Sequence, residues 1–259
     1  MIDTHCHLDR LDDPEGGADP GLAALVTVGT DPDSNERALA AAARHPNVWA
    51  AVGIHPGSAQ LASSGEVRDT VSRQARRPRV VAVGETGFDT HWDRTTAEQQ
   101  LSSFHFQAEL AGELDLPLIL HVRDAAGTRG ASAAACRALL NAGHRKGVLH
   151  CFNGDPELLR TGLDLGWYVS FAGNLTYRSA TALQEAAAEV PRERLLVETD
   201  SPYLTPVPLR GQRNVPANVR HTAAFLAELL SVPPADLEAA LDVNARRLFG
   251  FAAPAGDAA

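Results

Sequence analysis

Eight short runs rich in apolar and β-branched residues recur along the 259-residue chain, and alanine- and leucine-rich segments with helical spacing lie between them. This alternation is typical of parallel βαβ units, in which a helix returns the chain to the start of the next strand. The expected strands are residues 1–7, 24–29, 48–55, 80–85, 117–122, 147–152, 168–173 and 195–200. Eight repeats favour an α/β fold of the closed (β/α)8 TIM barrel type, and an open doubly wound sheet is the alternative.

A single domain fits the length and the composition of the chain. With 44% hydrophobic residues it can bury one large core, and we predict a domain over residues 1–252 with a short flexible tail over 253–259. No apolar run approaches the roughly 20 residues that cross a bilayer, so no membrane association is expected. Three widely spaced cysteines are an unsuitable set for a disulfide framework, which favours a cytoplasmic location.

Histidine and acidic residues end five of the eight expected strands. In a parallel barrel the carboxyl ends of the strands meet on one face, where active sites lie. His5 and His7 are two residues apart, so both can point inward while Cys6 points toward the helices and packs as an apolar residue, as we expect of Cys136 and Cys151. The other strand-end residues are Glu85, His121, His150, Glu198 and Asp200. Four imidazoles and two or three carboxylates around one mouth are a ligand set suited to two divalent ions.

Other polar residues near these strand ends are candidate substrate contacts. Arg123 follows the fifth expected strand, and Arg210 and Arg213 follow the eighth, so their guanidinium groups are suited to bind phosphate oxygens. A solvated surface position is the alternative for each, and for Arg213 above all. His55 ends the third expected strand, where a substrate contact and an ordinary loop position are equally compatible with the sequence. The segment GETG around Glu85 is too short for a phosphate-binding loop and is interpreted as a turn.

In their order along the chain, these motifs resemble the TatD family of metal-dependent hydrolases and deoxyribonucleases, which belongs to the amidohydrolase-like barrels. The resemblance covers almost the whole chain and rests on DTHCHLD, VGIHP, GETGFD, FHFQAELA, LPLILHVRDA, LHCFNG, SFAGNLTY, ETDSPYLTP, RGQRNVPANV and NARRLFG. It implies a (β/α)8 barrel whose metals are held by His5, His7, Glu85, His121, His150 and Asp200, with Glu85 in the place of the bridging carboxylate. One departure is the loop over residues 88–94, where HWDR follows Phe88, Asp89 and Thr90, and this loop bears on substrate preference.

The expected reaction is hydrolysis of a phosphodiester by metal-activated water. Two divalent ions (Mg²⁺, Mn²⁺ or Zn²⁺) about 3.5 to 4 Å apart would lower the pKa of a bound water toward about 7. Asp200 is the expected proton acceptor, with Glu198 as a supporting or alternate ligand and Glu85 as the third catalytic carboxylate. A formal net charge of −9 fits an enzyme that takes a strand end into a confined mouth, and does not fit one that coats duplex. We therefore predict a 3'-5' exonuclease acting on single-stranded DNA ends, with RNA as a further substrate.

Two other functions are alternatives. A metal-dependent hydrolase of a non-nucleic ester, amide or aminoacyl linkage would use the same residues, because a metal pair polarises a carbonyl equally well. A catalytically silent barrel that acts as an interaction protein would have lost some of the expected ligands, and none of the six is missing here.

Overall fold

The computed structural model describes residues 1–251, and its strands form one parallel sheet in the order β1 to β8. The strands are β1 (Ile2–Cys6), β2 (Ala24–Val28), β3 (Val48–Val52), β4 (Val80–Asp89), β5 (Leu118–Arg123), β6 (Gly147–Leu149), β7 (Tyr168–Phe171) and β8 (Leu195–Val197). The two edges of the sheet meet where Cys6 forms a parallel bridge with Ser201. The N–H of His7 donates to the carbonyl of Ser201 at 2.8 Å. The predicted barrel is confirmed, and the open sheet is wrong.

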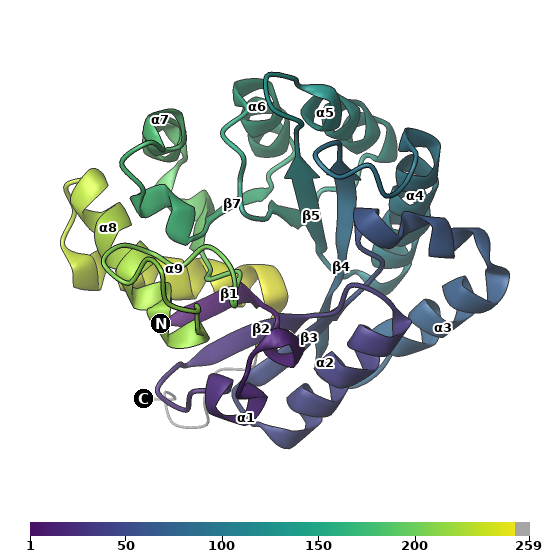
Figure 1. The fold of residues 1–259 in the computed structure, drawn as a ribbon, viewed down its shortest axis with the longest axis horizontal. Helices are drawn as coiled ribbons and strands as arrows, with labels where there is room; N and C mark the ends of the chain where they lie inside the picture. Colours follow the sequence, from purple (N-terminus) through teal and green to yellow (C-terminus); the bar gives the residue numbers. More distant parts are fainter. Residues whose placement is uncertain (252–259) are drawn as a thin grey trace.

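Helices surround the strands as a ring (Figure 1). They are α1 (Pro14–Gly17), α2 (Pro32–Arg44), α3 (Gly65–Ala75), α4 (Ala97–Leu114), α5 (Gly130–Ala142), α6 (Pro156–Asp164), α7 (Thr181–Glu189), α8 (Val219–Leu229) and α9 (Pro234–Phe249). The side chains of Asp31, Thr96 and Asp155 accept backbone N–H groups in the first turns of α2, α4 and α6. These capping residues fix where each helix begins. Within residues 1–251, none of the helices is both long and apolar enough to span a bilayer.

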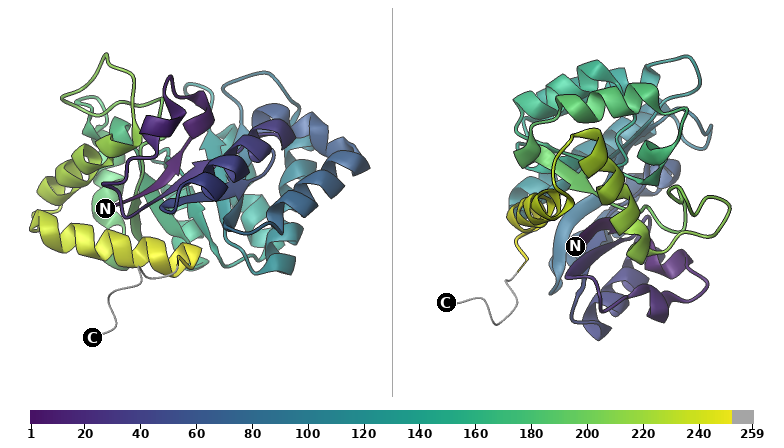
Figure 2. Two further views of the ribbon diagram at one scale, coloured as in Figure 1. Left: turned by 90° about the horizontal axis from the view of Figure 1, so that it is seen from below. Right: turned by 90° about the vertical axis from the view of Figure 1, so that its left-hand side faces the viewer.

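Two apolar layers hold the barrel together. The larger layer lies between the strands and the surrounding helices, and a smaller one fills the barrel interior. Helix α9 closes the amino end of the barrel, because Ala245 and Leu248 join the interior layer. The amino group of Met1 pairs with Glu238 and Asp242 of α9 at 2.9 and 3.1 Å. Figure 2 shows α9 on the opposite side of the molecule from the long loop that precedes α8. The carboxyl ends of the strands are left to form the site.

The segment GETG is part of strand β4, so its interpretation as a turn is wrong. Gly84 and Gly87 have φ angles of +134° and +139°, a region that residues with a side chain rarely adopt. A Cβ at Gly87 would lie 2.0 Å from the carbonyl oxygen of His121. The two glycines therefore allow β4 to lie close against β5 while the register between these strands shifts from Val83 to Thr86. The predicted tail, residues 253–259, lies outside the described residues.

Candidate metal centre

The strand-end residues meet around Glu85 at the carboxyl face of the barrel. Oε2 of Glu85 lies 3.4 Å from Nε2 of His5 and 3.6 Å from Nε2 of His7. Its other oxygen, Oε1, lies 2.8 Å from Nδ1 of His121 and 3.9 Å from Nε2 of His150. Each carboxylate oxygen thus faces a different set of imidazoles, which is the arrangement that a carboxylate between two cations requires.

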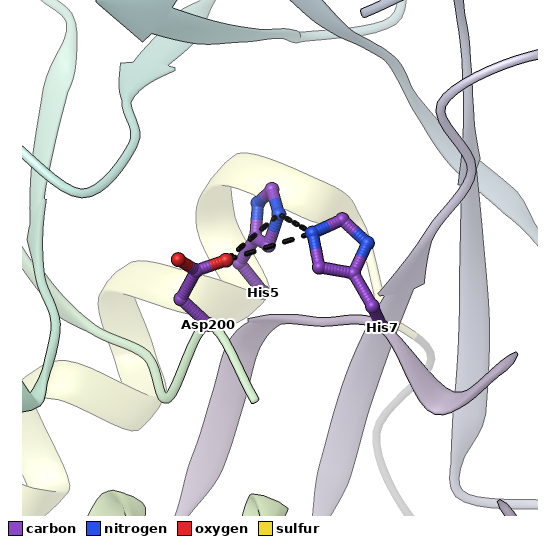
Figure 3. A group of neighbouring side chains, drawn as sticks. All are labelled: His5, His7 and Asp200. Atoms are coloured by element: carbon purple, nitrogen blue, oxygen red, sulfur yellow. Dashed lines mark hydrogen bonds and ion pairs between the residues drawn. The ribbon is translucent and has the colours of Figure 1, made fainter. Parts of the chain in front are cut away.

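Asp200 completes the group on the side of His5 and His7 (Figure 3). Oδ1 of Asp200 lies 3.5 Å from Nε2 of His7 and 3.9 Å from Nε2 of His5, and the two Nε2 atoms are 3.4 Å apart. The backbone of Asp200 has a φ of +52°, an unusual conformation that the surroundings stabilise. Its N–H donates to the carbonyl of His5 at 2.9 Å. The preceding Thr199 donates its N–H and its hydroxyl to the buried carboxylate of Asp3 at 2.9 and 2.6 Å.

The buried polar atoms of this group fit divalent cations. Within residues 1–251, Nδ1 of His5 and Oε2 of Glu85 are buried without a hydrogen-bond partner. Leaving a carboxylate oxygen in this state is costly unless a positive charge compensates it. Ligand atoms at about 2.1 Å from a tetrahedrally bound metal lie about 3.4 Å from one another. The separations of 3.4 to 3.6 Å between Nε2 of His5, Nε2 of His7 and Oε2 of Glu85 match that spacing.

Hydrogen bonds on the far sides of two imidazole rings distinguish a metal ligand from a hydrogen-bond donor. Nδ1 of His7 lies 2.9 Å from the carbonyl oxygen of Val28, which can only accept, so Nδ1 carries the hydrogen and Nε2 presents a lone pair. His55 is arranged the opposite way, because its Nδ1 accepts the N–H of Gly57 at 2.8 Å. Nε2 of His55 therefore carries the hydrogen and points at Oε1 of Glu85, 3.4 Å away. His7 is suited to bind a metal, whereas His55 is suited to donate.

His121 is held between two carboxylates. Its Nδ1 faces Glu85, and its Nε2 lies 3.1 Å from Oδ2 of Asp89. Burial alone would lower the pKa of His121, but the hydrogen bonds to Asp89 and Glu85 raise it to about 9. The other oxygen of Asp89 accepts the N–H groups of His91 and Trp92 at 2.8 and 3.0 Å. Asp89 thus connects the orientation of His121 with the conformation of the loop that follows β4.

His150 is held in a similar way by Glu198. Nδ1 of His150 lies 2.7 Å from Oε1 of Glu198, an oxygen that also accepts the N–H of Cys151 at 2.7 Å. Burial would lower the pKa of His150, but the Glu198 carboxylate raises it to about 9. The spacing of two residues would place Glu198 and Asp200 on one strand face, and the structure contradicts this expectation. Strand β8 ends at Val197, so strand alternation does not govern Glu198 and Asp200, and they face different imidazoles.

The charge states of the remaining groups follow from burial and from their neighbours. Burial would raise the pKa of Glu85, but the surrounding imidazoles, with His55 first among them, hold it well below its usual range. The pKa of Asp200 is also lowered, since the closeness of the His7, His150 and His5 imidazoles outweighs the effect of burial. Burial lowers the pKa of His55 to about 4, which keeps its ring neutral near pH 7. The site therefore presents ionised carboxylates and a neutral donor.

Comparison with known proteins places this site in a family. The profile of the TatD related DNase family matches residues 2–250. The chain belongs to this family. It is 38% identical over 261 residues to the uncharacterized metal-dependent hydrolase YcfH of Escherichia coli (strain K12), covering 96% of this chain and 95% of that protein. It is 36% identical over 255 residues to the 3'-5' ssDNA/RNA exonuclease TatD of Erwinia billingiae (strain Eb661), covering 96% of each.

A solved structure agrees with this assignment. The crystal structure of the TatD homolog YJJV from Escherichia coli K12 is 30% identical and superposes with a TM-score of 0.87, covering 97% of this chain and 98% of that chain. The protein is therefore a metal-dependent hydrolase of the TatD family, and the resemblance noted in the sequence is confirmed.

The three arginines singled out in this TatD family member occupy different surroundings. The guanidinium carbon of Arg123 lies 5.7 Å from the ring centre of Trp92. Arg210 stacks on Tyr177, with 4.1 Å between its guanidinium carbon and the ring centre. Arg213 pairs with Asp12 at 3.3 Å, as expected for a surface arginine. Among residues 1–251, only the first of these three is close to a side chain of the loop that Asp89 anchors.

The cysteines follow the expectation in part. Cys6 is fully buried in the outer apolar layer and donates to the carbonyl of Val26 at 3.4 Å, and Cys136 is buried in α5. Cys151 is partly exposed, so its expected burial is wrong. Strand β6 ends at Leu149, and Cys151 has a φ of +42°, so strand alternation does not apply at this position.

Two residues that position the site were missed in the sequence. Asp89 lies four residues after Glu85 in β4, and the period of two that places both on one strand face was the available signal. Gln107 of α4 is fully buried, and its oxygen accepts the N–H of Ile54 at 2.9 Å while its nitrogen donates to the hydroxyl of Thr86 at 2.8 Å. Nothing in the motif FHFQAELA indicates that Gln107 connects the chain after β3 with β4.

Proposed function

We propose that this protein is a two-metal deoxyribonuclease that removes nucleotides from the 3' ends of single-stranded DNA, with RNA as a further substrate. The observation that carries the proposal is the position of Glu85, whose two carboxylate oxygens face separate sets of imidazoles 2.8 to 3.9 Å away. The proposed ligands are His5, His7, Glu85, His121, His150 and Asp200, and the proposed ions are Mg²⁺, Mn²⁺ or Zn²⁺. When bound, such ions neutralise charge on a phosphate and lower the pKa of a water molecule.

In this proposal Asp200 removes the proton from the attacking water. Its Oδ1 faces His5 and His7, while its Oδ2 forms no hydrogen bond or ion pair within residues 1–251. The side chain is 15% exposed, so a water molecule can reach it. Asp200 thereby combines ligand and base in one carboxylate. Glu198 lies behind His150 and orients it, so its contribution to catalysis is indirect.

His55 is proposed to contact the substrate. Its Nε2–H points at Oε1 of Glu85 from the open side of the site, and the side chain is 23% exposed. A neutral donor in this position can hydrogen-bond a phosphate oxygen as negative charge develops there. Arg123 and Arg210 are the proposed phosphate contacts at the rim, because a guanidinium binds two oxygens of one phosphate.

The preference for strand ends rests on charge and on the shape of the barrel. A net charge of −9 leaves little general attraction for a long phosphate backbone, so binding has to come from a few groups at the mouth. The name of the Erwinia billingiae relative, a 3'-5' ssDNA/RNA exonuclease, supports the same substrate class and polarity.

The decisive assay compares three single strands of equal sequence: a linear strand, the same strand with a blocked 3' end, and a circle. With added Mg²⁺ or Mn²⁺ we expect stepwise shortening of the linear strand only. Asp200→Asn is the control for contaminating nucleases, and we expect it to lose at least about 10²-fold in rate with the fold intact. Cleavage of the circle as fast as the linear strand would show that the enzyme is not end-directed. Hydrolysis of small esters without any cleavage of DNA would replace the proposal with the non-nucleic alternative.

A further inference from the structure

The loop between β4 and α4 presents a tryptophan to solvent beside the candidate metal centre. Trp92 is 49% exposed, whereas Trp167 is fully buried and Trp49 is partly buried, with the guanidinium carbon of Arg79 4.2 Å from its ring centre. A single exposed apolar side chain is ordinary on a protein surface, so the case for Trp92 rests on its place beside the candidate metal centre and on its neighbours. Trp92 is therefore a candidate for a contact with a ligand.

Hydrogen bonds hold this loop in place from both ends. At its start, Oδ1 of Asp89 accepts the N–H of Trp92 at 3.0 Å, while Oδ2 lies 3.1 Å from Nε2 of His121. At its end, the hydroxyl of Thr95 donates to the carbonyl of Pro56 at 2.6 Å. A single carboxylate thus joins the backbone of Trp92 to a proposed metal ligand. The backbone of Trp92 is therefore held next to the site, so little ordering of the loop is needed when a ligand binds.

Two unpaired cations flank the indole. The guanidinium carbons of Arg94 and Arg123 lie 5.5 and 5.7 Å from the ring centre of Trp92. Among the described residues, neither guanidinium takes part in an ion pair or a hydrogen bond, whereas Arg129 is paired with Asp155. The two separations exceed the 4.2 Å of the close stack on Trp49, so neither arginine is packed tightly on the Trp92 ring. The His91 ring lies edge to face with the indole, with 4.7 Å between the ring centres, and with Trp92 49% exposed the indole and both cations remain accessible to a ligand.

We propose that Trp92, Arg94 and Arg123 form a stacking platform for one nucleobase of the bound strand. The base lies on the indole, and the two guanidiniums bind phosphates on either side of it. In a duplex, each base is stacked between its neighbours and paired with the opposite strand. A stacking platform therefore favours single strands. This inference rests on the proposed function and names the part of the chain that recognises the base.

Equilibrium binding without metal tests the platform separately from hydrolysis. A fluorescein-labelled oligothymidylate of about six nucleotides is titrated with the full-length protein in EDTA, and anisotropy gives Kd. An abasic strand of equal length reports phosphate contacts alone. The variants are Trp92→Ala, Trp92→Phe and, as a control for losing an exposed apolar side chain, Leu140→Ala on α5, where Leu140 is 63% exposed. Trp92 is the most exposed of the three tryptophans, so quenching of its fluorescence is a second readout.

We expect Trp92→Ala to weaken binding of the oligothymidylate by about 5- to 150-fold, to leave binding of the abasic strand unchanged, and to raise KM more than it lowers kcat. Trp92→Phe should recover most of the affinity, and Leu140→Ala should behave as the wild type. Equal affinity of Trp92→Ala and wild type, or an equal loss on the abasic strand, would overturn the platform.

The same experiment separates the platform from the proposed function. If the wild type hydrolyses single strands but does not bind them in EDTA, the platform is wrong and the proposed function stands, because stacking needs no metal. If the wild type neither binds nor hydrolyses single strands, both the proposed function and the stacking platform are wrong.

Discussion

Replacing Asp89 with asparagine isolates the charge that orients His121. The amide oxygen of asparagine can still accept the N–H groups of His91 and Trp92, so the loop keeps its anchor. The acceptor 3.1 Å from Nε2 of His121 becomes an uncharged NH2 group, which cannot accept from the imidazole. Hydrogen bonds to charged groups contribute about 1.5–3 kcal/mol, and carboxylates that support a ligating histidine typically change metal affinity by about 10- to 100-fold. We expect a loss of metal affinity in that range.

Isothermal titration calorimetry with Mn²⁺ or Zn²⁺ measures this loss, and circular dichroism establishes that the fold is kept. Asp93→Asn is the matched control, because it removes one exposed carboxylate from the same loop and should leave metal affinity unchanged. Asp89→Ala should lose more than Asp89→Asn, since it also removes the acceptor for the loop N–H groups. Metal affinities of Asp89→Asn and Asp93→Asn within twofold of each other would refute the claim that Asp89 positions a ligand.

Three further predictions test the site and the strand beneath it. His55→Ala should keep wild-type metal affinity in calorimetry while kcat falls by about 10- to 150-fold, and loss of bound metal in this variant would make His55 a ligand. Gly87→Ala places a Cβ 2.0 Å from a backbone oxygen of β5, so the free energy of unfolding in urea should fall by at least about 2 kcal/mol, and wild-type stability would disprove the close approach. Adding metal at about 100 times its Kd to EDTA-treated protein should raise Tm by about 5–10 °C in calorimetry, and an unchanged Tm would contradict a metal site built into the native state.

The barrel and the convergence of the six strand-end residues are predictable from the sequence for one geometric reason. In a closed parallel sheet every strand delivers its last residue to the same face, so a polar residue after each apolar run is enough to locate the site. Knowledge of the helices, the loops or the interstrand register is not required. Glu85 and His121 could therefore be brought together from positions 36 residues apart in the sequence without any contact being known.

The prediction that His5 and His7 point into the barrel is confirmed, but it depends on a backbone irregularity that the sequence pattern does not reveal. Ile2 belongs to the interior apolar layer, so strict alternation from Ile2 would turn His5 toward the helices. The register between β1 and β2 shifts between Asp3 and Cys6, which inserts one extra residue and returns His5 to the interior. Backbone irregularities of this kind depend on packing between strands. The same is true of Asp200, whose φ of +52° is stabilised by partners from β1.

The acidic net charge and a phosphate-bearing substrate are compatible because screening limits the range over which charges act. Exposed charges interact over about 8–10 Å at physiological salt, so the charge near the bound phosphate matters more than the total of −9. Among residues 1–251, Arg94 and Arg123 lie beside Trp92 with no acidic partner in an ion pair, while Arg37, Arg76 and Arg77 are each paired with a carboxylate. Net charge therefore constrains how long a stretch of nucleic acid the protein can hold, and says little about whether it binds one nucleotide at the mouth.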